Sequence, residues 1–328
     1  MATHDARSIV VGVNGSESAL NAAAWAATEA ALHDVPLRIV YGFAESVLRV
    51  RPGCGERGPK AGYARSARSL SMGRTGAIGV IVPDIVNPFF PPVIKAIQAR
   101  AATKDVSVLL ADTDEHVADE LERARALVRQ VDGLVLVSPR TPEKDLPAIL
   151  QLVPAVFVNR RVTGAPSVVV ENSEGINQAV QHLHALGHRR ICYLSGPRQS
   201  WSNEQRRTSM TNACARQGVE LAEFGPFEPQ MQAGVRAADL LRASGCTAVI
   251  AYDDVIALGV MARLAEHHLH VGGDISVLGI DDSPMSGVAY PTLTSIHVPG
   301  SQAGGIAVDL LLRHLDAKEL DPSPVVEL

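Results

Sequence analysis

Short apolar blocks alternate with longer amphipathic stretches along most of the chain. The apolar blocks predict strands at 77–82, 106–111, 133–137, 155–159, 190–195, 247–252 and 275–280. The amphipathic stretches predict helices at 91–104, 117–130, 143–152, 173–186, 203–217, 232–244 and 255–268. Because the strands are continuously apolar and alternate with helices, the pattern predicts an α/β fold with parallel sheets covered on both faces.

The strands fall into two series of similar length, which predict two similar lobes with a ligand cleft at the carboxyl ends of the strands. Polar residues stand at these ends. Asp84 follows the first strand, Asn159 ends the fourth, and Asp253 and Asp281 follow later ones. Asp253 and Asp281 could each instead cap the helix that comes after it, since carboxylates accept hydrogen bonds from the first backbone amides of a helix.

The first 44 residues have a pattern of their own. An apolar block at 8–13, an alanine-rich helical stretch at 18–33 and a second block at 37–43 predict a strand–helix–strand unit. The segment "IVVGVNGSESALNAAAWAATEAALHDVPLRIVYGF" resembles the start of a universal stress protein. Asn14 replaces that family's early aspartate, and no glycine-rich phosphate loop follows. We therefore expect a fragment that packs on something else and does not bind ATP.

Charge is unevenly distributed. The chain carries −5 overall, but residues 49–74 hold seven basic residues against Glu56, a net charge of +6 that leaves −11 for the rest. A confined basic segment on an acidic body indicates contact with phosphate or another anion, although a solvated basic linker has the same composition. The GxGxxG sequence at 53–58 lies between Pro52 and Pro59, so we interpret it as a flexible loop.

From residue 63 to about 320 the chain resembles the LacI/GalR family of ligand-responsive transcription regulators. The motifs are "SARSLSMGRTGAIGVIVPDIVNPFF", "VDGLVLVSPR", "VFVNR", "HLHALGHRRICYLSGPRQSWSNEQRR", "AYDDVIALGVMARL" and "VLGIDDSPMSGVAYPTLTSIHVP". The resemblance implies a homodimeric, periplasmic-binding-protein-like core that binds a small effector. It also implies these boundaries: 1–44, stress-protein-like fragment; 45–75, basic linker and hinge helix; 76–161 and 289–318, N-terminal lobe; 162–288, C-terminal lobe.

The same resemblance assigns the effector site. It makes Arg206, Asp253 and Asp281 effector contacts and Phe90 an apolar wall, alongside Asp84 and Asn159 at the strand ends. A guanidinium donates to vicinal hydroxyls and carboxylates accept from them, so the chemistry suits a sugar or related polyol better than a purine. The family usually has asparagine where this chain has Asp253.

The segment "ARSLSMGRT" at 67–75 resembles the family's hinge helix, in which a leucine wedges into the DNA minor groove. The predicted DNA contacts are Arg65, Ala67, Arg68, Leu70 and Arg74. A disordered basic tether is the alternative. Residues 1–62 show no pattern of two short helices around a tight turn, so we expect the helix-turn-helix reader to be missing and DNA contact to be limited to the hinge.

Other classes are not favoured. The paired aspartates resemble glycosidase acids, but no catalytic motif accompanies them. The four cysteines are scattered, and His184 and His188 flank a helix end, so neither a metal site nor a cofactor is expected. No leader or membrane-spanning run is evident, which indicates a cytoplasmic protein. The alternative function is a cytosolic small-molecule sensor that does not bind DNA.

Overall fold

The computed structural model describes residues 9–13, 22, 25–28, 37–41, 74–316 and 324–328, and it divides into units at 1–60 and 61–328. In the first unit, β1 (Ile9–Val13) pairs in parallel with β2 (Leu37–Tyr41), with Ile9 opposite Leu37 and Val13 opposite Tyr41. Residues 25–28 between them are helical. The two predicted strands therefore form here, while the likeness to a universal stress protein stays a prediction.

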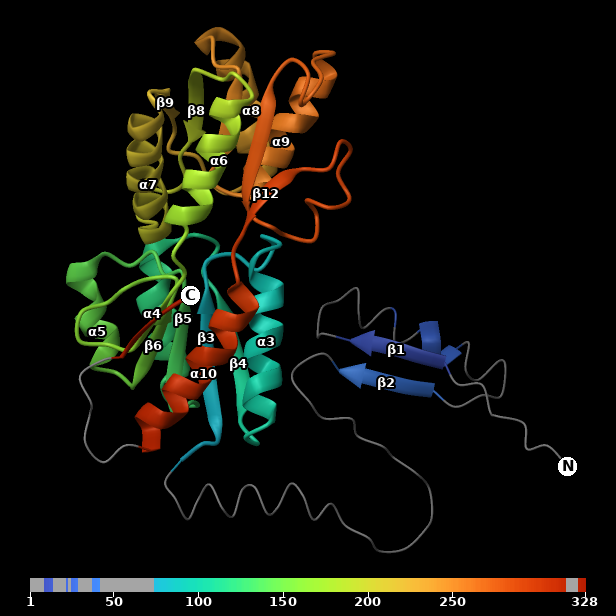
Figure 1. Ribbon diagram of the computed structural model, residues 1–328. Helices are drawn as coiled ribbons and strands as arrows, with labels where there is room; N and C mark the ends of the chain where they lie inside the picture. Colours follow the sequence, from blue (N-terminus) through green and yellow to red (C-terminus); the bar gives the residue numbers. More distant parts are fainter. Residues whose placement is uncertain (1–8, 14–21, 23–24, 29–36, 42–73, 317–323) are drawn as a thin grey trace, which may run out of the picture. The chain divides into compact units, whose positions relative to one another are not determined.

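The larger unit contains two parallel sheets flanked by helices, which confirms the predicted fold class (Figure 1). The N-terminal lobe has a six-stranded sheet of order β13-β7-β6-β5-β3-β4. Its strands are β3 (Ala77–Val82), β4 (Ser107–Asp112), β5 (Gly133–Val137), β6 (Ala155–Val158), β7 (Ser167–Val169) and β13 (Val325–Glu327). Its helices are α3 (Phe90–Ala102), α4 (Val117–Leu127), α5 (Leu146–Leu150), the 3-10 turn η1 (Glu143–Asp145) and α10 (Gly300–Asp316).

The C-terminal lobe has a five-stranded sheet of order β12-β11-β10-β8-β9. Its strands are β8 (Arg190–Leu194), β9 (Glu220–Phe224), β10 (Ala248–Ala251), β11 (Ser276–Asp281) and β12 (Thr294–His297). Its helices are α6 (Ser173–Ala185), α7 (Trp201–Gln217), α8 (Met231–Ser244) and α9 (Asp254–Glu266). Helices α6 and α7 pack together, as do α8 and α9.

Continuous apolar strands form the core because the central strands β3, β5, β6 and β10 are buried on both faces. In β5, Val135 and Val137 join the cluster around α3 and α10, whereas Leu134 and Leu136 join the cluster around α4 and α5. The same alternation in β8 directs Tyr193 toward α6 and α7 and its neighbours toward α8 and α9. Successive strands therefore end at one edge of each sheet, and the polar residues that follow them are brought together there.

The chain crosses between lobes later than the sequence predicts. β7 joins the N-terminal sheet although the predicted boundary at 161/162 assigns it to the other lobe. β12 joins the C-terminal sheet although residues 289–318 are predicted to be N-terminal. Both strands are only three or four residues long, and β12 reads "TSIH", so neither leaves a clear apolar block. The crossings lie at 170–172 and 298–299.

Helix α10 follows the second crossing and lies beside α3 (Figure 1). Arg100 of α3 donates two hydrogen bonds to Asp309 of α10, at 2.7 and 2.9 Å, and Gly304 allows the helices to approach closely. Among the described residues, no helix combines the length and apolarity that a membrane span requires.

Candidate functional site

Arg206 on α7 is the centre of the C-terminal lobe's polar wall. Its side chain is buried, and its Nη2 donates to Asp281 Oδ1 at 3.1 Å while Nη1 donates to the Tyr252 carbonyl. The guanidinium also lies over the Tyr252 ring, 4.8 Å from its centroid. Burial alone lowers the pKa of Arg206, but the Asp281 carboxylate raises it, so the guanidinium stays charged.

Asp253 joins the two lobes. It is the N-cap of α9, where its Oδ1 accepts a hydrogen bond from the Ile256 amide at 2.8 Å. Its Oδ2 accepts one from Asn87 Nδ2, which belongs to the other lobe, at 3.1 Å. Burial raises the pKa of Asp253 to about 6 and that of Asp281 well above the ordinary value for a carboxyl.

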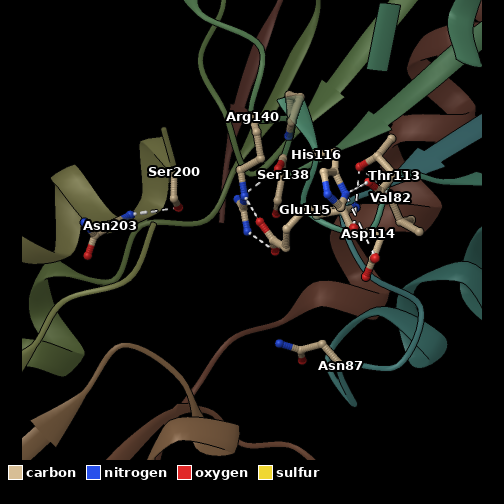
Figure 2. A network of polar contacts seen from close by, with 12 residues as sticks. Val82, Asn87, Thr113, Asp114, Glu115, His116, Ser138, Arg140, Ser200 and Asn203 are labelled. Atoms are coloured by element: carbon tan, nitrogen blue, oxygen red, sulfur yellow. Dashed lines mark hydrogen bonds and ion pairs between the residues drawn. The ribbon is translucent and has the colours of Figure 1, made fainter. Parts of the chain in front are cut away.

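The N-terminal lobe's wall is built around Arg140, which follows β5. Its Nε and Nη2 donate to the two carboxylate oxygens of Glu115 at 2.6 and 2.8 Å, and Nη1 donates to the Ser138 carbonyl at 3.0 Å (Figure 2). A bidentate ion pair fixes a guanidinium in position as well as in charge. Asn87 lies on a loop across from this pair in Figure 2, with its amide directed into the space between.

Three residues at strand ends have backbone conformations that side chains other than glycine rarely adopt. The φ angles are +47° at Ser138, +57° at Asn159 and +123° at Asp281. Asn159 Nδ2 donates to Ser138 Oγ at 3.1 Å, while Asn159 Oδ1 and Arg206 Nε are buried without a hydrogen-bond partner. Strained backbone and unpaired buried polar atoms gather at binding sites, because a ligand or a functional geometry compensates for them.

These side chains enclose a cavity of about 20 Å³, which we call the polar pocket. It is lined by Asn87, Phe89, Phe90, Ser138, Arg140, Asn159, Arg206, Pro229, Tyr252, Asp253 and Asp281. Five of the six predicted effector residues therefore lie together. Asp84 does not line the pocket, because its Oδ1 accepts from the Val86 amide at 2.7 Å within its own loop. Effector binding by these residues stays a prediction.

Sequence reasoning missed Ser138, Arg140 and Tyr252 as site residues. Ser138 directly follows the predicted strand at 133–137, Arg140 lies two residues further on, and Tyr252 ends the predicted strand at 247–252. The argument that selected Asn159 at a strand end therefore applies to them as well. Tyr252 is also positioned by a glycine, since a Cβ atom at Gly196 would lie 2.5 Å from its ring. Its hydroxyl contacts Ser200 Oγ at 2.9 Å, at the N-cap of α7.

Of the predicted DNA contacts, Arg65, Ala67, Arg68 and Leu70 lie outside the described residues. Arg74 is described, and its guanidinium is bound within the protein. Nη1 donates to Asp316 Oδ1 at 2.6 Å, and Nη2 donates to the Leu315 carbonyl at the end of α10. An arginine at a helix C-terminus is stabilised by the helix dipole as well as by the ion pair. A phosphate bound by Arg74 would compete with the Asp316 carboxylate for the charge of the guanidinium.

His188 has a structural role. Its two ring nitrogens contact Thr247 Oγ1 at 2.7 Å and Ser276 Oγ at 2.9 Å, which ties together the segments that lead into β10 and β11. Burial lowers the pKa of His188, which favours the neutral ring. In the part of the chain that the structure describes, no three metal-binding side chains converge.

The fold and site can now be compared with known proteins. The periplasmic binding protein-like domain family matches residues 180–328. The HTH-type transcriptional regulator GalS of Salmonella typhimurium is 30% identical over 256 residues, which are 76% of this chain and 75% of that one. The chain belongs to the LacI/GalR family. The matched relatives are named as regulators and repressors, which agrees with the prediction that this LacI/GalR protein is not an enzyme.

Solved structures of LacI-family regulators share the fold. One from Mycobacterium smegmatis is 29% identical, with 76% of this chain and 93% of that chain covered and a TM-score of 0.68. Another, from Enterococcus faecium with bound ribose, is 25% identical, with 77% and 94% covered and a TM-score of 0.68. The two-lobed LacI/GalR core is thus established for this chain.

Proposed function

We propose that this protein is a ligand-responsive transcriptional regulator that binds a small neutral sugar in the polar pocket between its lobes. The observation that carries the proposal is the convergence of Arg140 and Arg206, one from each lobe, with Asn159, Asp253 and Asp281 in one cavity. A relative with bound ribose supports the class of ligand.

Charge balance favours a neutral ligand. Each arginine already has a carboxylate partner, Glu115 for Arg140 and Asp281 for Arg206. Neither guanidinium therefore offers an uncompensated positive charge to a phosphate, yet both keep donor groups for hydroxyls. Asp253 and Asn159 supply acceptors. The hydroxyl groups of a polyol can accept hydrogen bonds from the two arginines and donate them to Asp253 and Asn159. A fully ionised phosphate can only accept.

The cavity of about 20 Å³ is far below the range of about 300–1,000 Å³ typical of small-molecule sites. A sugar must therefore enter through a more open arrangement of the lobes. The hydrogen bond from Asn87 to Asp253 would break on opening, and the ligand would favour reclosure. A ligand that binds the closed arrangement more tightly shifts the equilibrium toward it, which is what a regulatory switch requires.

Calorimetry with ribose, glucose and galactose tests the proposal. We expect at least one of these sugars to bind the wild-type chain and the Arg207→Ala variant equally, because Arg207 is exposed, pairs with Glu204 and Glu223, and does not line the polar pocket. The Arg206→Ala variant should lose binding at least 100-fold. No binding of any neutral sugar by the folded wild-type chain would overturn the proposal.

DNA binding is expected to be weak and confined to the hinge residues Arg65, Ala67, Arg68, Leu70 and Arg74. Residues 1–62 carry no helix-turn-helix pattern, so base contacts in the major groove are not expected. That same observation favours the alternative function, a cytosolic sensor that does not bind DNA. Gel shifts with genomic fragments, with and without sugar, separate the two. A retained, sugar-sensitive and sequence-specific complex would contradict the expectation of weak binding.

Homodimerisation and a cytoplasmic location complete the proposal. Light scattering coupled to size-exclusion chromatography measures the mass of the particle in solution and so tests homodimerisation directly. We expect twice the chain mass of 34.8 kDa at micromolar concentration. A stable monomer would mean that any hinge response does not depend on pairing of two copies.

A further inference from the structure

The segment 138–141, which follows β5 and carries Arg140, is buried along its whole length. Ser138 has a φ angle of +47°, which ends the extended conformation of the strand. Buried backbone amides and carbonyls that leave a sheet need other hydrogen-bond partners. Two side chains from elsewhere in the N-terminal lobe, those of Glu120 and Arg160, bind the backbone of this segment.

Glu120 of α4 accepts the hydrogen bonds that this segment donates. It is only 1% exposed. Its Oε1 accepts from the Arg140 amide, and its Oε2 accepts from the Thr141 amide at 2.8 Å and from the Thr141 hydroxyl. Hydrogen bonds to a carboxylate are stronger than those between neutral groups. One side chain therefore fixes two consecutive residues of the segment.

Arg160, which lies two residues after β6, supplies the matching donor. Its Nη1 donates to the Pro139 carbonyl at 3.1 Å and to the Thr141 carbonyl at 2.6 Å. Burial lowers the pKa of Arg160, and the charge of Glu120 opposes that effect. Glu120 thus binds backbone donors of the segment while Arg160 binds backbone acceptors, so both side chains restrain the same short stretch of chain.

This restraint matters for the polar pocket because the side chain of Arg140 folds back on the segment. Its Nη1 donates to the Ser138 carbonyl at 3.0 Å, while Nε and Nη2 bind Glu115 (Figure 2). Arg140 and Ser138 line the polar pocket, whereas neither Glu120 nor Arg160 does. We therefore expect any effect of Glu120 on a ligand in the pocket to pass through Arg140.

We propose that Glu120 is a positioning residue for effector binding, which holds segment 138–141 so that Arg140 presents its donors to the polar pocket. This inference rests on the proposed function and names a residue outside the pocket on which the affinity depends. A guanidinium that is already ordered loses less conformational entropy when a ligand binds, so the ligand binds more tightly. Glu115 pairs with the guanidinium, and Glu120 fixes the backbone from which the guanidinium extends.

A double-mutant cycle on sugar affinity tests the proposal. Calorimetry with ribose, glucose and galactose compares the wild type with Glu120→Gln, Arg140→Ala and the double variant. Glutamine keeps the size of the side chain but places an amide donor against the backbone amides of the segment. We expect Glu120→Gln to lower the affinity about 5- to 10-fold in the wild-type background and less than about 2-fold in the Arg140→Ala background. Glu122→Gln, at an exposed position on the same helix, is the matched control and should change neither.

An equal loss in both backgrounds would overturn the proposal, because Glu120 would then affect the pocket without Arg140. Thr141→Val repeats the cycle if Glu120→Gln does not fold, since it removes only the hydroxyl donor to Glu120. The expected loss is then about 2- to 3-fold and is confined to the background that retains Arg140.

Exchange of the Arg140 Nε proton with water, followed by NMR, gives a readout that needs no ligand. The signal is identified by its absence in Arg140→Ala. We expect exchange about 10-fold faster or more in Glu120→Gln than in the wild type and Glu122→Gln, because the pairing with Glu115 loosens when the segment moves. Unchanged exchange would overturn the proposal whether or not a sugar binds. If exchange is faster but no sugar binds, the proposed function fails and the positioning of Arg140 by Glu120 stands.

Discussion

The two lobes present an arginine to the same pocket but hold it in different ways. In the N-terminal lobe, Arg140 is paired with Glu115, whose side chain is still 16% exposed. In the C-terminal lobe, Arg206 is paired with Asp281, and the two side chains are only 3% and 7% exposed. One carboxylate can therefore turn to water when its partner is removed, whereas the other cannot.

The carboxyl groups differ between the lobes as well. Asp253, Asp254 and Asp281 lie close together in the C-terminal lobe, and burial raises the pKa of each. Asp254 is tied to the backbone amide of Ser283 at 2.7 Å and to the Ser295 hydroxyl. The C-terminal lobe thus holds three buried carboxyl groups near Arg206, whereas the carboxylate that pairs with Arg140 is partly exposed. Because of this difference, removal of the arginine should lower the free energy of unfolding by different amounts in the two lobes.

Removal of Arg206 is expected to have the largest effect. In an Arg206→Ala variant Asp281 stays buried without its cation, so the free energy of unfolding should fall by about 3–5 kcal/mol. Urea denaturation measures it. Arg207→Ala is the control and should change stability by less than about 1 kcal/mol. Addition of Asp281→Asn to Arg206→Ala should recover much of the loss. No recovery would mean that Asp281 is not the source of the cost.

Removal of Arg140 is expected to have a smaller effect on stability. An Arg140→Ala variant frees Glu115 to reach water, so a loss of about 1–3 kcal/mol is expected. Sugar affinity should nevertheless fall 10-fold or more, since one wall of the pocket loses its donor. Arg100→Ala, which breaks an exposed pair with Asp309 in the same lobe, is the control for both measurements. A cost equal to that of Arg206→Ala would remove the contrast between the lobes.

The raised pKa of Asp253 predicts how the stability of the protein depends on pH. Its folded-state pKa of about 6 lies above the ordinary value of 3.8, so the folded chain binds this proton more tightly than the unfolded chain. The stability that it contributes is complete below about pH 4 and is lost as the pH rises through about 6. An Asp253→Asn variant should therefore exceed the wild type at pH 8 by up to about 3 kcal/mol.

Denaturation of both proteins at pH 5 and pH 8 checks this prediction. Asparagine keeps an oxygen that can cap α9, so the helix start should persist. Asp282→Asn is the control for the same substitution at an exposed aspartate, since the Asp282 side chain is 51% exposed. Parallel pH profiles for Asp253→Asn and the wild type would show that Asp253 is not the titrating group.

Much of the fold was predictable because buried parallel strands leave an unmistakable apolar signal. The seven predicted strands and six of the seven predicted helices form with ends shifted by a few residues at most. The predicted helix at 143–152 forms instead as the 3-10 turn η1 followed by the five-residue helix α5. β9 reads "ELAEF" at a sheet edge, where polar residues are tolerated, and so it gave no such signal. Helix α10 was not placed either, although it buries Ala303, Ala307, Leu310 and Leu311.

Part of the candidate site was likewise predictable from the sequence, and part was not. Strand ends and the family resemblance were enough to bring Arg206, Asp253 and Asp281 to one place. The pairings were not predictable, because Glu115 reaches Arg140 from a loop 25 residues earlier. The positive φ angles of Ser138 and Asn159 also depend on tertiary contacts that no sequence pattern records. A separate cavity of about 370 Å³ is lined by residues near 89, 282 and 300, which come together only in the folded chain.

Asn87→Ala probes the contact between the lobes and should have the smallest effect. It removes the hydrogen bond to Asp253 that joins them, and a single such bond contributes about 0.5–1.5 kcal/mol. Because the bond joins the two lobes beside the polar pocket, its loss should weaken sugar affinity by about 2- to 10-fold while each lobe keeps its own arginine pair. Asn87 Oδ1 also accepts from the Phe89 amide at 3.0 Å, so Asn87→Ser serves as a control that keeps a side-chain oxygen near that amide. Equal affinity in the alanine variant and the wild type would mean that closure depends on the ligand alone, whereas a loss shared by alanine and serine assigns the effect to the contact between the lobes and not to the loop.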